Sequence, residues 1–226
     1  KNYYLFLSLV MFLMGCGADS RSTRSSDEAK NSDADTPAIC SISDGINWPA
    51  LLSEDINSLC SRLSDYRLFS DAADPRSGAS IGGIRYELNS QLFTDYARKY
   101  RYLYIPNEGT AEYSEDEVFD FPVGTVVAKI FSLPEDTANP KESIIEVRLM
   151  IHRPSGWVGL PYVWDDDLKD GILDLDGESI EFSLTHKGEV YSDYYSVPSY
   201  GSCRTCHQFS GTMSLIGLKA RNLNKN

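Results

Sequence analysis

The chain reads IIEVRLMIH from Ile144 to His152, and this stretch decides the fold class. Two sets of residues alternate along it, with Ile145, Val147, Leu149 and Ile151 in one set and Glu146, Arg148, Met150 and His152 in the other. Successive side chains of a β-strand point to opposite faces of a sheet. The period of two therefore predicts a strand with one buried face and one solvated face.

Five further stretches are rich in β-branched and aromatic residues and are separated by Gly, Pro, Asn and Asp. They are residues 100–105, 125–133, 157–164, 179–185 and 189–197. These strands, within one domain over residues 39–226, predict a mainly β fold, either an antiparallel β-sandwich or an open barrel, with a few short helices. One helix is expected at about residues 54–64, because Ser53 suits an N-cap and apolar residues follow at helical spacing.

A second decisive stretch is CRTCH at residues 203–207. Two cysteines separated by two residues and followed by a histidine form the CxxCH pattern that attaches c-type haem. The two thiols can add to the two vinyl groups of one porphyrin, and the imidazole then becomes an axial ligand of the iron. We predict one haem c, bound by Cys203, Cys206 and the proximal ligand His207, on a C-terminal attachment loop.

Two other interpretations of these cysteines are weaker. A zinc site needs four ligands, whereas Cys40, Cys60, His152 and His186 are scattered singly along the chain. A redox CxxC of the thioredoxin type begins a helix within a βαβ unit, whereas the residues on both sides of CRTCH have the composition of loops.

The sixth ligand of the iron decides between two classes of function. Met213 lies six residues beyond His207 and is the candidate for the distal position, with Met150, His152 and His186 as alternatives. A filled distal position predicts an electron-transfer cytochrome. An open position predicts a five-coordinate redox enzyme or gas-binding protein, and a docking lipoprotein with a secondary haem is a third interpretation.

The N-terminus predicts export. Residues 5–14 are almost wholly apolar and too few to span a bilayer, so residues 1–15 are expected to be a signal peptide. Leu13 to Cys16 resembles a bacterial lipobox, which implies acylation of Cys16 and anchoring in the outer membrane, facing the periplasm or the cell surface. An ordinary signal with an incidental cysteine is the alternative. Residues 16–38 are polar and are expected to form a disordered tether.

Cysteine use and charge agree with an exported protein. After Cys16, Cys203 and Cys206, the remaining cysteines are Cys40 and Cys60, which we predict to form a disulfide rather than two buried thiols. The net charge of −12 disfavours nucleic acid and favours a soluble redox partner with a basic surface. Because 19 residues follow His207, whereas a small cytochrome c carries its motif near the start of a helical domain, we expect a C-terminally truncated chain.

Several stretches together resemble a family of exported bacterial di-haem c-type cytochromes of unknown role. They are residues 63–69, 86–97, 119–125, 156–157, 160–164, 197–198, the CxxCH at 203–207 and 216–224. The resemblance implies a second CxxCH region, which this chain lacks, and a neighbouring parallel β-helix protein as a possible partner.

Residues 121–129, FPVGTVVAK, followed by a Trp-containing strand and a late CxxCH, are similar to the small β-sheet cytochromes. That group includes the hydroxylamine-oxidising enzymes and cytochrome c-prime-beta. The similarity implies that Lys129 points at the porphyrin. A solvent-facing strand lysine is the alternative.

Overall fold

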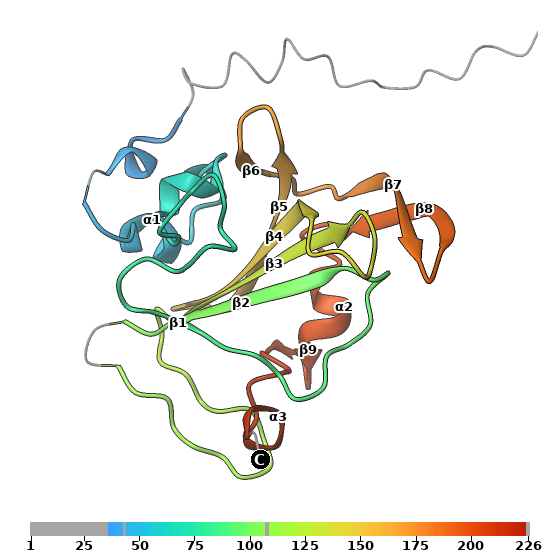
Figure 1. Cartoon of the computed structure of the whole chain (residues 1–226). Helices are drawn as coiled ribbons and strands as arrows, with labels where there is room; N and C mark the ends of the chain where they lie inside the picture. Colours follow the sequence, from blue (N-terminus) through green and yellow to red (C-terminus); the bar gives the residue numbers. More distant parts are fainter. Residues whose placement is uncertain (1–35, 43, 107–108, 225–226) are drawn as a thin grey trace, which may run out of the picture. The chain divides into compact units, whose positions relative to one another are not determined.

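A six-stranded antiparallel sheet organises residues 36–42, 44–106 and 109–224, which the computed structural model describes (Figure 1). Its strands follow one another in chain order, and each pairs with the next. They are β1 (Gly83–Arg85), β2 (Arg98–Tyr104), β3 (Val126–Pro134), β4 (Glu142–Arg153), β5 (Gly156–Asp165) and β6 (Asp170–Leu173). A separate hairpin follows, formed by β7 (Glu178–His186) and β8 (Glu189–Val197).

The predicted fold class is confirmed, because the structure is mainly antiparallel β with a few short helices and an open sheet. All six predicted strands are present as β2, β3, β4, β5, β7 and β8. The short strands β1 and β6 were not predicted, since three and four residues give too little alternation to detect.

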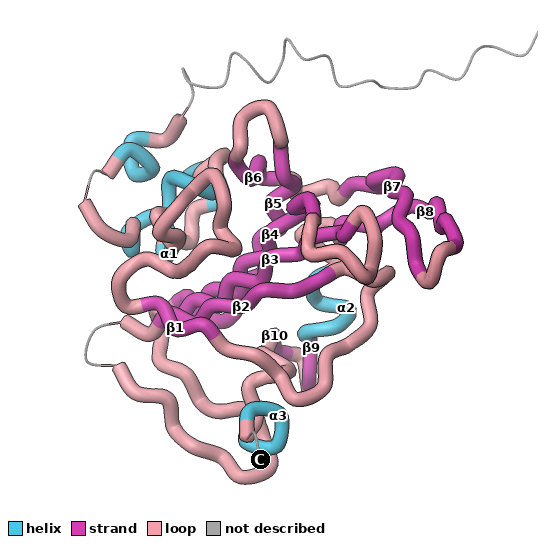
Figure 2. The backbone as a smooth tube through the Cα atoms, in the orientation of Figure 1, coloured by secondary structure: helices cyan, strands magenta, loops and turns pink. Residues whose placement is uncertain are grey.

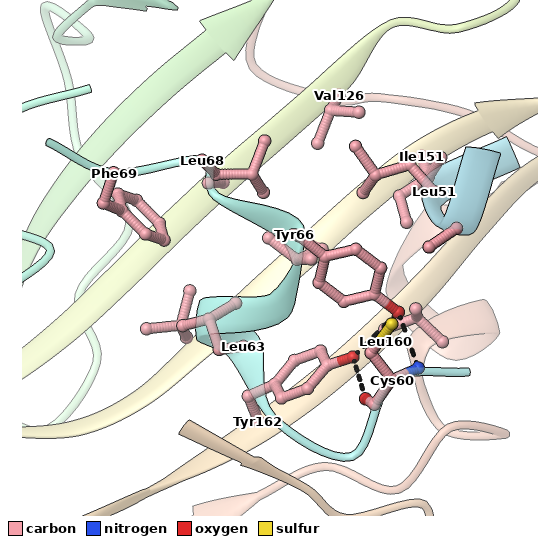
Figure 3. Packing of buried hydrophobic residues seen from close by; sticks show 14 of the residues in the cluster. Leu51, Cys60, Leu63, Tyr66, Leu68, Phe69, Val126, Ile151, Leu160 and Tyr162 are labelled. Carbon is pink, nitrogen blue, oxygen red and sulfur yellow. Dashed lines mark hydrogen bonds between the residues drawn. The ribbon is translucent and has the colours of Figure 1, made fainter. Parts of the chain in front are cut away.

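One face of the sheet, here called the core face, packs against the N-terminal segment. That segment contains η2 (Ala38–Ser41), α1 (Trp48–Leu52), η3 (Ile56–Ser58) and η4 (Leu63–Tyr66). The core face presents Tyr102, Tyr104, Ala128, Val147, Leu149 and Tyr162, all of them buried. Figure 3 shows the Tyr66 and Tyr162 side chains directed at Cys60, whose backbone N–H and carbonyl they bind at 3.2 and 2.9 Å.

The predicted disulfide between Cys40 and Cys60 is confirmed. The two Cα atoms are 5.6 Å apart, and both cysteines belong to the buried cluster of the core face. The bond closes a loop of about 20 residues and so fastens the start of the described chain to the layer beneath the sheet.

The predicted helix at residues 54–64 is wrong. Helix α1 ends earlier, at Leu52, and its cap is Asn47, whose Oδ1 accepts from the Ala50 N–H at 3.2 Å. Asp55 accepts from the Asn57 N–H at 2.9 Å and so begins only a three-residue 3-10 turn. The Cys60 N–H then binds the Tyr66 hydroxyl instead of a helical carbonyl, so the chain continues in an extended form.

The second face of the sheet, here called the site face, presents Lys99, Arg101, Leu103, Val127, Lys129, Arg148, Met150 and Gly159. At one end the β7–β8 hairpin packs on it through Leu184, Tyr195 and Val197. At the other end the C-terminal segment packs on it through Leu215 and Leu218. Figure 2 shows the backbone of this segment on one side of the sheet. The prediction that β4 has one solvated face is therefore wrong, since Glu146 is 0% exposed and Met150 is buried as well.

A β-bulge in β4 changes which residues share a face. Phe131 pairs with Glu146 and Ser132 with Ile144, so Ile145 is the extra residue. Ile145 packs with the hairpin cluster on the site face, whereas Val147 packs on the core face. The predicted grouping of Ile145 with Val147, Leu149 and Ile151 is wrong at this one position, because the bulge shifts the alternation.

The predicted signal peptide, the lipidated Cys16 and most of the predicted tether lie outside the described residues. At the end of the predicted tether, Ala38 already belongs to η2. Within the part of the chain that the structure describes, no helix is both long and apolar enough to cross a bilayer.

Candidate haem-attachment site

Residues Cys203–His207 form a single helical turn, α2, rather than the predicted loop (Figure 1). Local hydrogen bonds produce this turn. The Ser199 side chain and carbonyl both accept from the Ser202 N–H, at 3.2 and 3.0 Å, and the Ser202 carbonyl accepts from the Thr205 N–H at 3.0 Å. A short hairpin of β9 (Gln208–Phe209) and β10 (Thr212–Met213) follows directly.

Cys203 and Cys206 are both free thiols, and they differ in exposure. Cys203 is half-buried and lies over Gly159 of β5, where an added Cβ would be 3.0 Å from its Sγ. Burial raises the pKa of the Cys203 thiol, and the Arg148 guanidinium acts in the opposite direction. Cys206 is exposed. The two thiols therefore lie at the boundary between the site face and solvent.

His207 is oriented by Ser214, the residue that directly follows β10. Its Nδ1 lies 2.9 Å from the Ser214 carbonyl oxygen, and the Ser214 N–H donates to the His207 carbonyl at 2.7 Å. A carbonyl oxygen only accepts, so Nδ1 carries the proton and donates it. Nε2 is then the atom with a lone pair, which is the arrangement that metal-bound histidines use. Burial lowers the pKa of the imidazole and favours this neutral form.

Three cationic side chains form a row across the site face. Arg101 of β2 is the register partner of Lys129 of β3, which is in turn the partner of Arg148 of β4. Lys129 and Arg148 both lower the pKa of His207, so these two cations of the row lie near the CxxCH segment. Burial lowers the pKa of Lys129 to about 7, with further lowering by Arg101 and Arg148. Lys129 is thus half-buried beside the predicted attachment site.

Glu146 is the buried counter-charge of this row. Its carboxylate accepts from Arg148 Nε at 2.8 Å and Arg148 Nη2 at 2.5 Å, and from the Tyr195 hydroxyl at 2.5 Å. The Phe131 ring lies between the cations, 4.5 Å from Lys129 Nζ and 4.4 Å from the Arg148 guanidinium carbon. Sequence reasoning missed the roles of Arg101 and Glu146. The sequence pattern that could have identified them is charge at alternate positions of two strands that are otherwise apolar or aromatic.

The candidate distal ligands lie in different parts of the structure. Met213 pairs with Gln208 in the β9–β10 hairpin, close to His207 in the chain. Met150 lies next to Cys203, since its Sδ would be 3.3 Å from a Cβ on Gly159. His152 stacks on Trp157 at 4.6 Å, and its Nδ1 binds the Phe121 carbonyl. His186 binds Thr137 beside the β7–β8 hairpin. Of these, Met150 is the one brought to the thiols from a distant part of the chain.

A pocket of about 210 Å³ lies next to Ser214, the backbone partner of His207. Its lining includes Phe119, Phe121, Trp157, Ser214 and Leu215. Pockets for drug-sized ligands have about 300 Å³ or more. The pocket is therefore smaller than a porphyrin needs. The donor set fits haem c nonetheless, with two free thiols, an imidazole with an available Nε2, and cations for the carboxylates.

The alternative metal interpretation gains no support from the geometry. Among the described residues, the one group of three close Cys, His, Asp or Glu ligands is Cys40, Cys60 and Asp65, in which both cysteines belong to the disulfide. The CxxCH segment has no such group around it within the described ranges. The thioredoxin-type redox interpretation gains no support either, because the CxxCH segment is followed by a hairpin and not by the helix of a βαβ unit.

The resemblances to cytochrome families depend on short motifs. Comparisons of this chain with models of protein families, with curated proteins and with solved structures find no match.

Proposed function

We propose that this chain is an exported c-type cytochrome that binds one haem covalently and transfers electrons. Cys203 and Cys206 form the thioethers, and His207 is the proximal ligand. The observation that carries the proposal is the hydrogen bond from His207 Nδ1 to Ser214, because it leaves Nε2 available beside two free thiols in the CxxCH spacing. Bound haem supplies a one-electron iron couple.

The protein groups around the site have separate roles in this proposal. Ser214 fixes the tautomer and orientation of His207. The apolar cluster of Phe121, Val127, Met150, Leu215 and Leu218 excludes water from one side. The ion pair of the half-buried Arg148 and the buried Glu146 sets the local electrostatic potential. Met150 and Met213 are the methionines near the site, and we propose that the sulfur of one of them is the distal ligand of the iron.

Location and partners follow from the sequence. We propose that acylation of Cys16 anchors the protein to the outer membrane and that its partners are redox proteins. With a net charge of −12, the chain favours a partner that presents a basic surface.

A second candidate function is a five-coordinate haem protein that binds a small redox substrate or a gas. The observation in its favour is the row of Arg101, Lys129 and Arg148 with the Glu146 carboxylate on the site face. Buried charged groups beside an iron can donate hydrogen bonds to a bound ligand, and an electron carrier with a filled distal position does not require them.

The test is a visible absorption spectrum of the protein expressed with its leader and a haem-maturation system. Oxidised and reduced spectra are recorded with and without nitric oxide. A low-spin spectrum that nitric oxide leaves unchanged supports the electron carrier, and a high-spin spectrum that shifts supports the second candidate. The control is the double variant Cys203→Ala, Cys206→Ala. Haem that stays covalently bound in this variant would refute both functions.

A further inference from the structure

Arg101 is a buried charged group on the site face with an unsatisfied donor. It is 3% exposed, and its Nη1 is buried without a hydrogen-bond partner. An unsatisfied buried donor costs about 1–3 kcal/mol, and more when it belongs to a charged group. Burial lowers the pKa of Arg101, but a guanidinium keeps its charge in proteins. A buried cation with an unused donor indicates that an anion binds there.

The groups that surround Arg101 do not neutralise it. Lys129, its register partner, is a second cation. Tyr86 lies near it, and burial raises the pKa of that phenol to about 12, which keeps it neutral. The carboxylate that acts on Arg101 is Glu87, which is exposed and also lies 3.8 Å from Arg85. Glu146, on the same face, already binds Arg148.

Arg101 also lies at a suitable distance from the thiols. Cys203 lies over Gly159 of β5, whereas Arg101 belongs to β2, three strands away in the same sheet. Three strand spacings of about 4.8 Å make about 14 Å across the strands. Arg101 also lies two residues along β2 from Leu103, the residue in register with Gly159, so its Cα is about 16 Å from that of Gly159. The porphyrin of haem carries its two propionates on the edge opposite its two vinyl groups. A porphyrin bound to Cys203 and Cys206 and directed across the strands therefore brings its carboxylate edge toward β2.

The other arginines near the motif are less suitable. Arg148 is occupied by Glu146. Arg153 donates from Nε to the Leu51 carbonyl at 3.0 Å and so contacts the N-terminal segment. Arg204 follows Cys203 directly and is exposed.

We propose that Arg101, assisted by Lys129, is the binding site for a haem propionate carboxylate and so fixes the direction of the porphyrin on the site face. This inference rests on the proposed function. A guanidinium can bind a carboxylate in bidentate fashion, and the buried Nη1 then gains the acceptor that the protein does not provide.

The test compares the haem-loaded wild type with Arg101→Gln and Arg101→Lys. The matched control is Arg85→Gln, an exposed arginine on the neighbouring strand β1. Midpoint potentials are measured at one pH by spectroelectrochemistry. Loss of Arg101 removes a cation and leaves a carboxylate uncompensated, and both effects disfavour the reduced iron. We expect the midpoint potential of Arg101→Gln to fall by about 59 mV. For one electron this is a tenfold decrease in the ratio of reduced to oxidised protein at a fixed applied potential. Arg101→Lys keeps most of the potential, and Arg85→Gln leaves it unchanged.

A second readout identifies the carboxylate. Infrared difference spectra are recorded with haem whose propionates carry an isotopic label. We expect the labelled carboxylate band to move in Arg101→Gln and to stay in Arg85→Gln. An unmoved band together with an unchanged potential overturns the inference. Added succinate tests the other source of a carboxylate. If it shifts the potential of the wild type but not of Arg101→Gln, the site takes a free anion and the propionate assignment is wrong.

The two proposals fail separately. A wild type that carries no covalent haem overturns the proposed function and this inference with it. A wild type that carries haem c, with Arg101→Gln indistinguishable from Arg85→Gln in both readouts, overturns this inference alone.

Discussion

Glu146 illustrates at the scale of one residue how much a buried charge depends on its partners. It is fully buried and binds Arg148 and Tyr195. We expect Glu146→Gln to lower the free energy of unfolding by about 1–3 kcal/mol, because the change weakens the charge-assisted hydrogen bonds of Arg148, whose side chain is 29% exposed. Urea unfolding measures this value. Glu135→Gln is the control, since Glu135 is 58% exposed and pairs with the exposed Lys141, a contact worth less than about 1 kcal/mol. Equal losses in the two variants would contradict this account.

Lys129 gives a second prediction, which concerns pH. Burial lowers its pKa from 10.5 to about 7, so between these values the unfolded chain holds a proton that the folded chain lacks. Stability from this group therefore rises with pH across that window. The measured quantity is the unfolding free energy of Lys129→Met minus that of the wild type, both made without haem. We expect this difference to decrease by about 2 kcal/mol between pH 7 and pH 9.

The control for Lys129→Met is Lys141→Met, whose side chain is 71% exposed and whose stability difference is expected to stay constant. Urea unfolding of the three proteins at the two pH values supplies the measurement. A Lys129→Met advantage that does not change with pH would mean that the ammonium group is well solvated in the folded protein.

At the scale of elements, the contact between α2 and β5 depends on a glycine. A methyl group at Gly159 would lie 3.0 Å from Cys203 Sγ and 3.3 Å from Met150 Sδ. We expect Gly159→Ala to destabilise the protein by about 1–3 kcal/mol through overpacking and to lower the haem content per chain. Gly201→Ala is the control, because a methyl group there meets nothing within 4 Å. The ratio of haem absorbance to protein absorbance measures the haem content. Equal haem content in Gly159→Ala and Gly201→Ala would contradict the prediction.

The elements also show what the sequence could and could not predict. The strands were predictable because β-branched and aromatic runs between turn residues have one dominant interpretation. The helix at residues 54–64 failed because apolar spacing around Cys60 does not reveal that its N–H binds the distant Tyr66 hydroxyl. The bulge at Ile145 failed for a related reason, since an extra residue is defined by the partner strand.

At the scale of the whole molecule, the disulfide joins the N-terminal layer to itself beneath the sheet. We expect the double variant Cys40→Ala, Cys60→Ala to lose about 3 kcal/mol of unfolding free energy, because its unfolded chain is less restricted. Since both cysteines belong to the core face, the visible spectrum of the haem-loaded variant is expected to match the wild type. Thermal unfolding and absorbance provide the two values, and a changed spectrum with intact folding would show coupling between the faces.

The residues of the site also divide into those that the sequence alone predicts and those that depend on strand pairing. Cys203, Cys206 and His207 are adjacent in sequence, so their pattern is complete before any fold is known. Arg101 and Glu146 belong to strands β2 and β4, and the register of three strands places them on one face. The pattern of charges in a single strand does not contain that register.

The chain-order arrangement of the sheet has a consequence for biosynthesis. Each of its six strands pairs with the one before it, and all of them precede the CxxCH segment in the chain. If the chain is exported as we propose, it crosses the membrane N-terminus first, so the six strands can pair on the far side before the CxxCH segment arrives. The two cysteines then meet a sheet whose strands are already paired.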